Sequence, residues 1–181
     1  PIDKPNKNQI EQNIIQLINS SDADYIIFAE NNYPHIIYDS NFFDIIKSIK
    51  NKKKVIFGAT REEDDKFYNS FILLEDGKIQ YFDKKILVPF GEFLPLRKFL
   101  KFMEKISGTI DYESGNIDRL LTTKEGINIF PIICYEIIFD HIFKNINKYE
   151  IDILINITND SWFGKKIGPY QHFYLSRLKL E

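Results

Sequence analysis

The sequence predicts a layered α/β fold with a mixed sheet. Short apolar segments typical of buried strands alternate with segments whose apolar residues recur at helical spacing, and one hairpin is inserted among them. The chain has 181 residues, of which 44% are hydrophobic and 28% are charged. This length and composition suit one domain with a sizeable buried core. No repeat or linker divides the sequence, so we expect residues 1–181 to belong to a single domain.

The first half of the chain is expected to open with a helix and to continue into buried strands. Residues 7–20 place Ile10, Ile14 and Ile18 on one helical face. The apolar run at 25–29 predicts a buried strand that ends at Glu30. The Asp-Gly pair at 76–77 predicts a tight hairpin turn. The other expected elements are a helix at 42–49 and strands at 55–58, 67–74 and 78–82.

The second half alternates strands and helices after a loop at 88–95. The expected elements are helices at 96–106, 139–147 and 170–181 and strands at 127–134 and 151–157. The last helix has no Gly, Asn or Pro exit signal. We therefore expect the natural protein to continue past it and the fold to be incomplete at both ends.

Composition excludes several classes of function. The 24 basic and 26 acidic residues give a net charge of −2, so we expect no nucleic-acid partner. One Cys and three separated His residues argue against a disulfide and against a structural zinc site, and we expect no metal and no cofactor. No run approaches the roughly 20 apolar residues that span a bilayer.

Three ionisable residues follow predicted buried strands. Glu30, Lys84 and Cys134 each lie at or just beyond a strand end. Open α/β sheets gather strand ends at one edge, where ligands bind, so these side chains are expected to meet. Glu30 could take the thiol proton, and Lys84 could stabilise the thiolate and then an oxyanion. The set therefore suits acyl transfer.

Each of these residues also has a simpler interpretation. A lone Cys after an apolar run is usually a small buried hydrophobic residue. Glu30 could be a surface residue or a helix cap, and Lys84 beside Lys85 could form a solvated pair. The residue types alone leave both interpretations open.

Four longer segments carry a resemblance to a known family. They are FDKKILVPFGEFLP at 82–95, ICYEIIF at 133–139, NITNDSWFG at 156–164 and GPYQH at 168–172. In order and approximate spacing the sequence resembles the nitrilase superfamily and, within it, the apolipoprotein N-acyltransferases. The resemblance implies a nitrilase-like αββα sandwich with mixed sheets, in the α/β class.

The resemblance also implies roles for individual residues. Glu30 would be the general base, Lys84 the oxyanion-stabilising lysine and Cys134 the nucleophile. Residues expected to support these three are Glu92, Tyr135 and Glu136. Residues expected to contact substrate are Phe93, Leu94, Asn159 and Trp162.

The implied reaction is acyl transfer through a Cys134 thioester. The expected donor is a membrane phospholipid, and the acceptor is the α-amino group of a diacylglyceryl-cysteine at an apolipoprotein N-terminus. The expected location is the bacterial inner membrane, with this domain facing the periplasm. The basic, apolar segment 96–106 would suit a membrane surface, although an ordinary core-facing helix explains it equally well.

Two alternatives stay open at this point. A soluble carbon–nitrogen hydrolase could use the same triad on a small amide or nitrile, and a split gene could leave an inactive remnant. The chain also departs from the family pattern: KKIL stands at 84–87 where Lys-x-His-Leu is common, and Ala29 replaces a frequent Pro. Neither departure removes a catalytic group.

Overall fold

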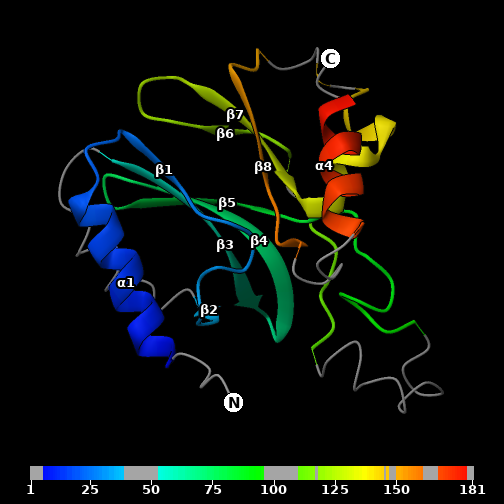
Figure 1. The fold of residues 1–181 in the computed structure, drawn as a ribbon, viewed down its shortest axis with the longest axis horizontal. Coiled ribbons are helices and arrows are strands. Elements are labelled where there is room, and N and C mark those ends of the chain that lie inside the picture. The colour runs from blue at the N-terminus through cyan, green and yellow to red at the C-terminus, as the bar shows by residue number, and fades with distance from the viewer. Residues whose placement is uncertain are drawn as a thin grey trace.

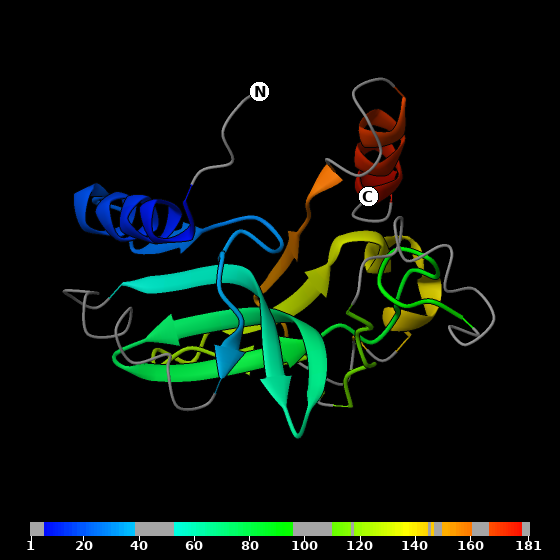
Figure 2. The ribbon, with the colours of Figure 1, turned by 90° about the horizontal axis from the view of Figure 1, so that it is seen from below.

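The computed structural model describes residues 6–38, 53–95, 110–116, 118–144, 146, 150–160 and 167–178. Within this part of the chain, two β-sheets pack together, and helices α1 and α4 lie at opposite ends of the molecule in both views (Figures 1 and 2). The predicted α/β sandwich with mixed sheets is confirmed, since each sheet contains parallel and antiparallel strand pairs.

The larger sheet has the strand order β1-β3-β4-β5, with the short β2 beside β3. Strand β3 runs parallel to β1 and β2 and antiparallel to β4, which in turn is antiparallel to β5. Strands β1, β3 and β5 therefore point the same way. Their bounds are β1 Tyr25–Ile27, β2 Ile37–Tyr38, β3 Lys54–Glu63, β4 Lys66–Glu75 and β5 Lys78–Asp83.

The smaller sheet has the order β6-β7-β8, with β7 antiparallel to β6 and parallel to β8. Two short 3-10 helices, η2 and η3, follow β7. The bounds are β6 Leu121–Thr122, β7 Asn128–Ile133, η2 Cys134–Ile138, η3 Asp140–Ile142, β8 Ile153–Ile157, α1 Lys7–Ser20 and α4 Gly168–Leu178.

Side-chain alternation divides the core into layers, because successive residues of a strand face opposite sides of the sheet. On β3, Val55 and Phe57 pack with Ile14 and Ile18 of α1, whereas Ile56 faces the smaller sheet. Helix α1 has the predicted bounds, and the Asn6 side chain caps it by accepting from the Asn8 N–H at 3.1 Å.

The space between the sheets is filled by large apolar side chains. Phe71 and Phe82 from the larger sheet pack with Ile129 and Ile133 of β7, all completely or almost completely buried. Phe130 faces the other way, where it joins a cluster with residues of η2 and η3. Cys134 belongs to the inter-sheet cluster, so the packing of the two sheets fixes the position of its thiol.

The hairpin at Asp76-Gly77 is confirmed, with φ of 47° and 73° at the turn. Strand β3 is longer than the predicted 55–58 because it forms a second hairpin with β4. Asp64 and Asp65 make that turn with φ of 50° and 59°, and this second hairpin was not predicted. Strand β2 was also not predicted.

The helix expected at 139–147 is wrong where residues are described. The chain forms η2 and η3 there, and extended Phe139 separates them with φ −90° and ψ 111°. The final helix begins earlier than expected, at Gly168, because Pro169 is tolerated in a first turn. The helices expected at 42–49 and 96–106 lie outside the described residues. Across the described ranges, every helix is too short or too polar to cross a membrane.

Candidate active site

The carboxyl ends of strands from both sheets meet at one edge of the sandwich. Glu30 follows β1 and Lys84 follows β5 in the larger sheet, while Cys134 follows β7 in the smaller sheet. The backbone N–H of Asn159, after β8, donates to Glu30 Oε2 at 3.1 Å and so links the two sheets directly. The structure thus brings the predicted residues to a common edge.

Gly58 allows the Glu30 turn to lie against β3. A Cβ at this position would lie 2.6 Å from Glu30 Cα and 2.5 Å from Asn31 N, closer than real side chains approach. The Gly58 N–H donates to the carbonyl of Ala29 at 3.2 Å. A side chain at Gly58 would therefore displace the segment that carries the carboxylate.

Lys84 is a buried cation between two carboxylates. Its Nζ lies 2.8 Å from Glu92 Oε1 and 3.7 Å from Glu30 Oε1, and its side chain is only 1% exposed. Burial alone would lower the pKa of Lys84, but the charges of Glu92 and Glu30 outweigh it and raise the pKa. The ammonium is therefore charged at neutral pH.

Asn69 joins the two carboxylates through one amide. Its Nδ2 donates to Glu30 Oε1 at 2.8 Å and to Glu92 Oε1 at 2.7 Å. Glu92 is further held by the N–H of Val88 at 2.8 Å. Glu30, Lys84, Glu92 and Asn69 thus form one buried network, in which each charged group has a partner of opposite charge or a hydrogen-bond donor.

Cys134 sits at a strained turn between β7 and η2. Its φ is 54°, a left-handed conformation that costs energy for any residue with a Cβ. Burial and the charge of Glu30 raise the pKa of the thiol to about 11, against the opposing influence of Lys84 and a hydrogen bond with Thr158. The thiol is therefore protonated at neutral pH, and thiolate formation requires a nearby proton acceptor.

Glu136 ties the nucleophile turn to the lysine loop. Its fully buried carboxylate pairs with Arg119, whose two terminal nitrogens lie 2.8 Å from its two oxygens. The same carboxylate accepts from the backbone N–H groups of Lys85, Ile86 and Ile133 at 2.9, 3.2 and 3.1 Å. The segments after Lys84 and before Cys134 are thereby held in register.

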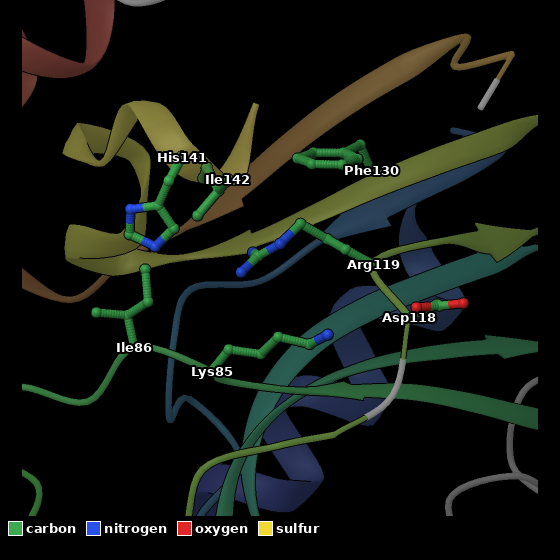
Figure 3. A pocket seen from close by; sticks show the side chains of 7 residues that line it. All are labelled: Lys85, Ile86, Asp118, Arg119, Phe130, His141 and Ile142. Atoms are coloured by element: carbon green, nitrogen blue, oxygen red, sulfur yellow. The ribbon is translucent and has the colours of Figure 1, made fainter. Parts of the chain in front are cut away.

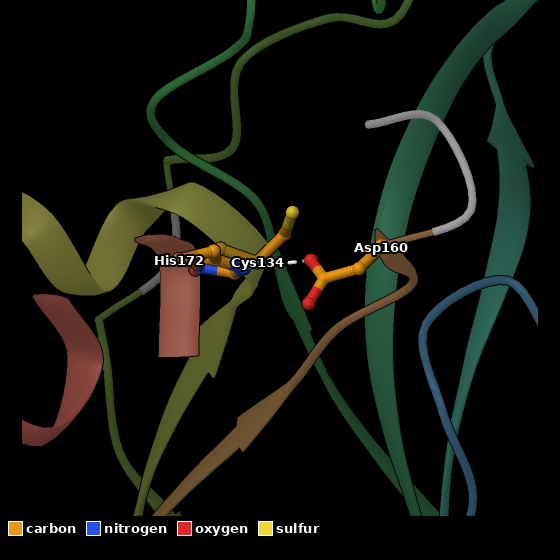
Figure 4. A group of neighbouring side chains, drawn as sticks. All are labelled: Cys134, Asp160 and His172. Atoms are coloured by element: carbon orange, nitrogen blue, oxygen red, sulfur yellow. Dashed lines mark hydrogen bonds and ion pairs between the residues drawn. The ribbon is translucent and has the colours of Figure 1, made fainter. Parts of the chain in front are cut away.

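A second polar group lies beside the thiol. His172 of α4 contacts Asp160 after β8, with Nδ1 2.7 Å from Oδ1. The Cys134 sulfur and ligand atoms of Asp160 and His172 lie within 4.8 Å of one another (Figure 4). This spacing could admit a metal ion, but Nδ1 of the ring already faces the Asp160 carboxylate and Nε2 the Cys134 carbonyl oxygen.

The family of the chain can be assigned from its sequence. The sequence model of the carbon-nitrogen hydrolase family matches residues 4–179, which is nearly the whole chain. The chain belongs to the carbon-nitrogen hydrolase family.

Known relatives of this carbon-nitrogen hydrolase chain are much longer proteins. An apolipoprotein N-acyltransferase of Rickettsia typhi is 45% identical over 121 residues, which cover 65% of this chain and 24% of the relative. Another, from Wigglesworthia glossinidia brevipalpis, is 38% identical over 192 residues, covering 95% of this chain and 38% of the relative. The predicted resemblance to this group is confirmed, although the chain spans well under half the length of these relatives.

Solved structures confirm the carbon-nitrogen hydrolase fold. A CN-hydrolase superfamily protein of Xanthomonas campestris, which carries an arsenic adduct in its active site, superposes with a TM-score of 0.67. The match covers 96% of this chain and 64% of that protein at 14% sequence identity. Identity this low supports a shared fold alone.

The other predicted residues occupy varied positions in this carbon-nitrogen hydrolase domain. Tyr135 stacks on the His172 ring with centroids 5.0 Å apart. Phe93 is half-buried, whereas Leu94 is buried and its N–H donates to Asp111 Oδ1 at 2.8 Å. Support of the nucleophile by Tyr135, and contact of Phe93 and Leu94 with substrate, stay predictions. Trp162 lies outside the described residues.

Some residues of the site were not predicted. Asn69 has a weak sequence signal, because it and Ser70 are polar residues within a mainly apolar predicted strand. Arg119 carries no comparable signal, because its partner Glu136 is recognisable only once the chain is folded. Asp160 follows the predicted strand 151–157 and was expected to shape the pocket wall, but its contact with His172 was not predicted.

A separate cavity of about 210 Å³ lies on the outer side of β7. Its lining includes Lys85, Arg119, Phe130 and His141, and Figure 3 shows these side chains around it. None of the three predicted catalytic residues lines this cavity. It is therefore distinct from the candidate active site.

Proposed function

We propose that this domain is the catalytic part of an apolipoprotein N-acyltransferase. It transfers an acyl chain from a membrane phospholipid to the α-amino group of a diacylglyceryl-cysteine at a lipoprotein N-terminus. The observation that carries the proposal is the buried cation Lys84, paired with Glu30 and Glu92 at the edge where Cys134 lies. The names of the relatives support the choice of acyl transfer within the family.

The first half-reaction forms a thioester. Glu30 accepts the proton of the Cys134 thiol as sulfur attacks the carbonyl carbon of the phospholipid ester. The ammonium of Lys84 stabilises the tetrahedral oxyanion. When the intermediate collapses, the lysophospholipid oxygen leaves and takes the proton from Glu30. Cys134 then carries the acyl chain.

The second half-reaction forms an amide. The α-amino group of the acceptor attacks the thioester carbonyl carbon and passes a proton to Glu30. Lys84 again stabilises the oxyanion, and the Cys134 thiolate leaves and recovers the proton. Phospholipid and lipoprotein are thus the proposed partners, and the proposed location is the inner membrane with this domain facing the periplasm.

The test is N-acylation by the full-length protein, with phospholipid vesicles and a diacylglyceryl-cysteine peptide as substrates. Substitution C134A should lower the rate about 1,000-fold or more and should abolish the hydroxylamine-sensitive acyl adduct seen by mass spectrometry. K84M should also lose activity, whereas K78M, at an exposed lysine of β5, should not. Wild-type rates for C134A would overturn the proposal.

Family membership also favours a second candidate, hydrolysis of a small amide, in which water replaces the amine as acceptor. This function predicts turnover of simple amides without lipid or detergent. Turnover of such amides at rates above those of lipid N-acylation would favour the hydrolase.

A further inference from the structure

His172 is the side chain that α4 buries, although it is polar. It is 2% exposed, whereas Tyr170, Phe173 and Tyr174 of the same helix are at least 60% exposed. Burial of a polar group is costly unless the group is hydrogen-bonded. The burial of His172 in preference to its aromatic neighbours therefore indicates that its contacts matter.

The ring of His172 joins three elements at the nucleophile. Nδ1 lies 2.7 Å from Asp160 Oδ1 at the end of β8, and Nε2 lies 3.3 Å from the carbonyl oxygen of Cys134 at the end of β7. One face of the ring stacks on Tyr135 with an interplanar angle of 17°. In Figure 4 a dashed line joins the His172 ring to the Asp160 carboxylate, next to Cys134.

Both ring nitrogens thus face oxygen atoms that can only accept hydrogen bonds. A ring with one N–H donates to one of these oxygens, and a ring with two N–H groups donates to both. The geometry therefore suits a donor to Cys134 O rather than an acceptor of the thiol proton. This separates the role of His172 from that of Glu30.

We propose that His172 is a positioning residue, oriented by Asp160, which holds the carbonyl oxygen of Cys134 and so fixes the left-handed turn that presents the thiol. The proposal rests on the proposed function of Cys134 as the nucleophile. A residue with φ of 54° persists only if its surroundings constrain it. The contact with His172 is a constraint of this kind.

Thr158 connects the same group to the sulfur. Its hydroxyl lies 3.2 Å from Asp160 Oδ1, and it also makes a hydrogen bond with the Cys134 side chain. The hydroxyl has one proton, so it donates to Asp160 or to sulfur at a given moment. Asp160 therefore orients both the ring that holds the Cys134 carbonyl and the hydroxyl that contacts the Cys134 thiol.

The conservative substitutions of His172 distinguish positioning from simple packing. The amide nitrogen of Gln can replace Nε2 and keep the bond to Cys134 O, whereas the amide nitrogen of Asn replaces Nδ1 and keeps only the bond to Asp160. We expect H172Q to retain at least 10-fold more N-acylation kcat than H172N or H172A, with KM within about twofold of wild type. D160N should lower kcat in the same way.

The second readout is the rate at which iodoacetamide labels Cys134 in the full-length protein across pH 7–10, which needs no lipid substrate. H172N and H172A should shift this pH profile, whereas H172Q and the control Q171N, at an exposed neighbouring residue, should follow wild type. Circular dichroism identifies variants that fail to fold. If H172N and H172A do not fold, the separate variants H172Q and D160N are compared instead. H172N activity equal to or above that of H172Q overturns the proposal. Shifted labelling profiles for H172N and H172A, together with no N-acylation by the wild-type protein, overturn the proposed function instead.

Discussion

At the residue scale, the candidate site contains two carboxylates with different partners. Glu92 lies 2.8 Å from Lys84 Nζ, whereas Glu30 lies 3.7 Å from it and receives an N–H from the other sheet. Burial and, after it, the charge of Glu30 raise the pKa of the Cys134 thiol. This difference supports Glu30 as the proton acceptor and Glu92 as the residue that keeps Lys84 charged.

Substitution E30Q should affect thiol labelling and catalysis in opposite directions. Removal of the Glu30 charge lowers the pKa of Cys134 from its value of about 11. Because more thiolate then exists below that pH, iodoacetamide should label Cys134 about threefold to tenfold faster at pH 8. N-acylation should nevertheless fall at least about 100-fold, because the proposed general base is lost. A parallel fall in both rates would contradict the assignment of Glu30.

Substitution E136Q should act mainly on the free energy of unfolding and less on the catalytic rate per folded molecule. The variant leaves the buried guanidinium of Arg119 without a counter-charge and weakens three backbone contacts. We expect a loss of roughly 3–5 kcal/mol in the free energy of unfolding, measured by urea titration. E63Q, at a partly exposed ion pair, is the matched control and should lose no more than about 1 kcal/mol.

The convergence of Glu30, Lys84 and Cys134 could be predicted from sequence because each follows a predicted strand. The burial predicted for the first of these strands is wrong, since Ile27 of β1 is 51% exposed. The hydrogen bonds that Asn69 and Asp160 make could not be predicted in this way. The Asn69 bond to Glu30 joins residues 39 positions apart, and the Asp160 partner lies on a different element. Such contacts depend on strand order and register, which the local sequence pattern does not specify.

At the scale of elements, apolar runs correctly predicted the central strands, but the predicted bounds were wrong where strands continue through polar residues. Strand β3 continues through Arg61 because Asp83 neutralises its guanidinium, with Nη2 and Oδ2 2.7 Å apart. The segment predicted as a helix at 139–147 begins with extended Phe139, and the short 3-10 helix η3 follows it.

Substitution G58A tests how β3 supports the Glu30 turn. The new Cβ would meet Glu30 Cα at 2.6 Å, so the Glu30 backbone must move. Because small displacements of a catalytic group are costly, N-acylation should fall about 100-fold. Unfolding free energy should fall by roughly 1–3 kcal/mol.

The matched glycine control for G58A is G126A. Gly126 has φ of 86° and no atom within 4 Å of the added Cβ, so this variant should lose roughly 1–2 kcal/mol from backbone strain alone. Its activity per folded molecule should match wild type. Equal catalytic losses in both variants would show that general destabilisation, not displacement of Glu30, explains G58A.

At the scale of the whole molecule, the candidate site exists only while the two sheets stay packed. Glu30 and Lys84 come from the larger sheet and Cys134 from the smaller one. Phe71 fills the space between the sheets and belongs to the same cluster as Cys134, whereas Ile18 of α1 packs on the other face of the larger sheet. Both side chains are buried, so truncating either should lower the free energy of unfolding by a similar amount. The two cavities lie on opposite faces of the larger sheet.

Substitutions F71A and I18A should therefore separate stability from site geometry. F71A should lose roughly 3–5 kcal/mol and I18A roughly 2–5 kcal/mol in urea unfolding. Under conditions where both remain folded, F71A should lower N-acylation per folded molecule and speed iodoacetamide labelling, because the cavity loosens the burial of Cys134. I18A should leave both rates near wild type, since its cavity opens on the other side of the larger sheet. Identical catalytic behaviour in the two variants would mean that inter-sheet packing does not position the nucleophile.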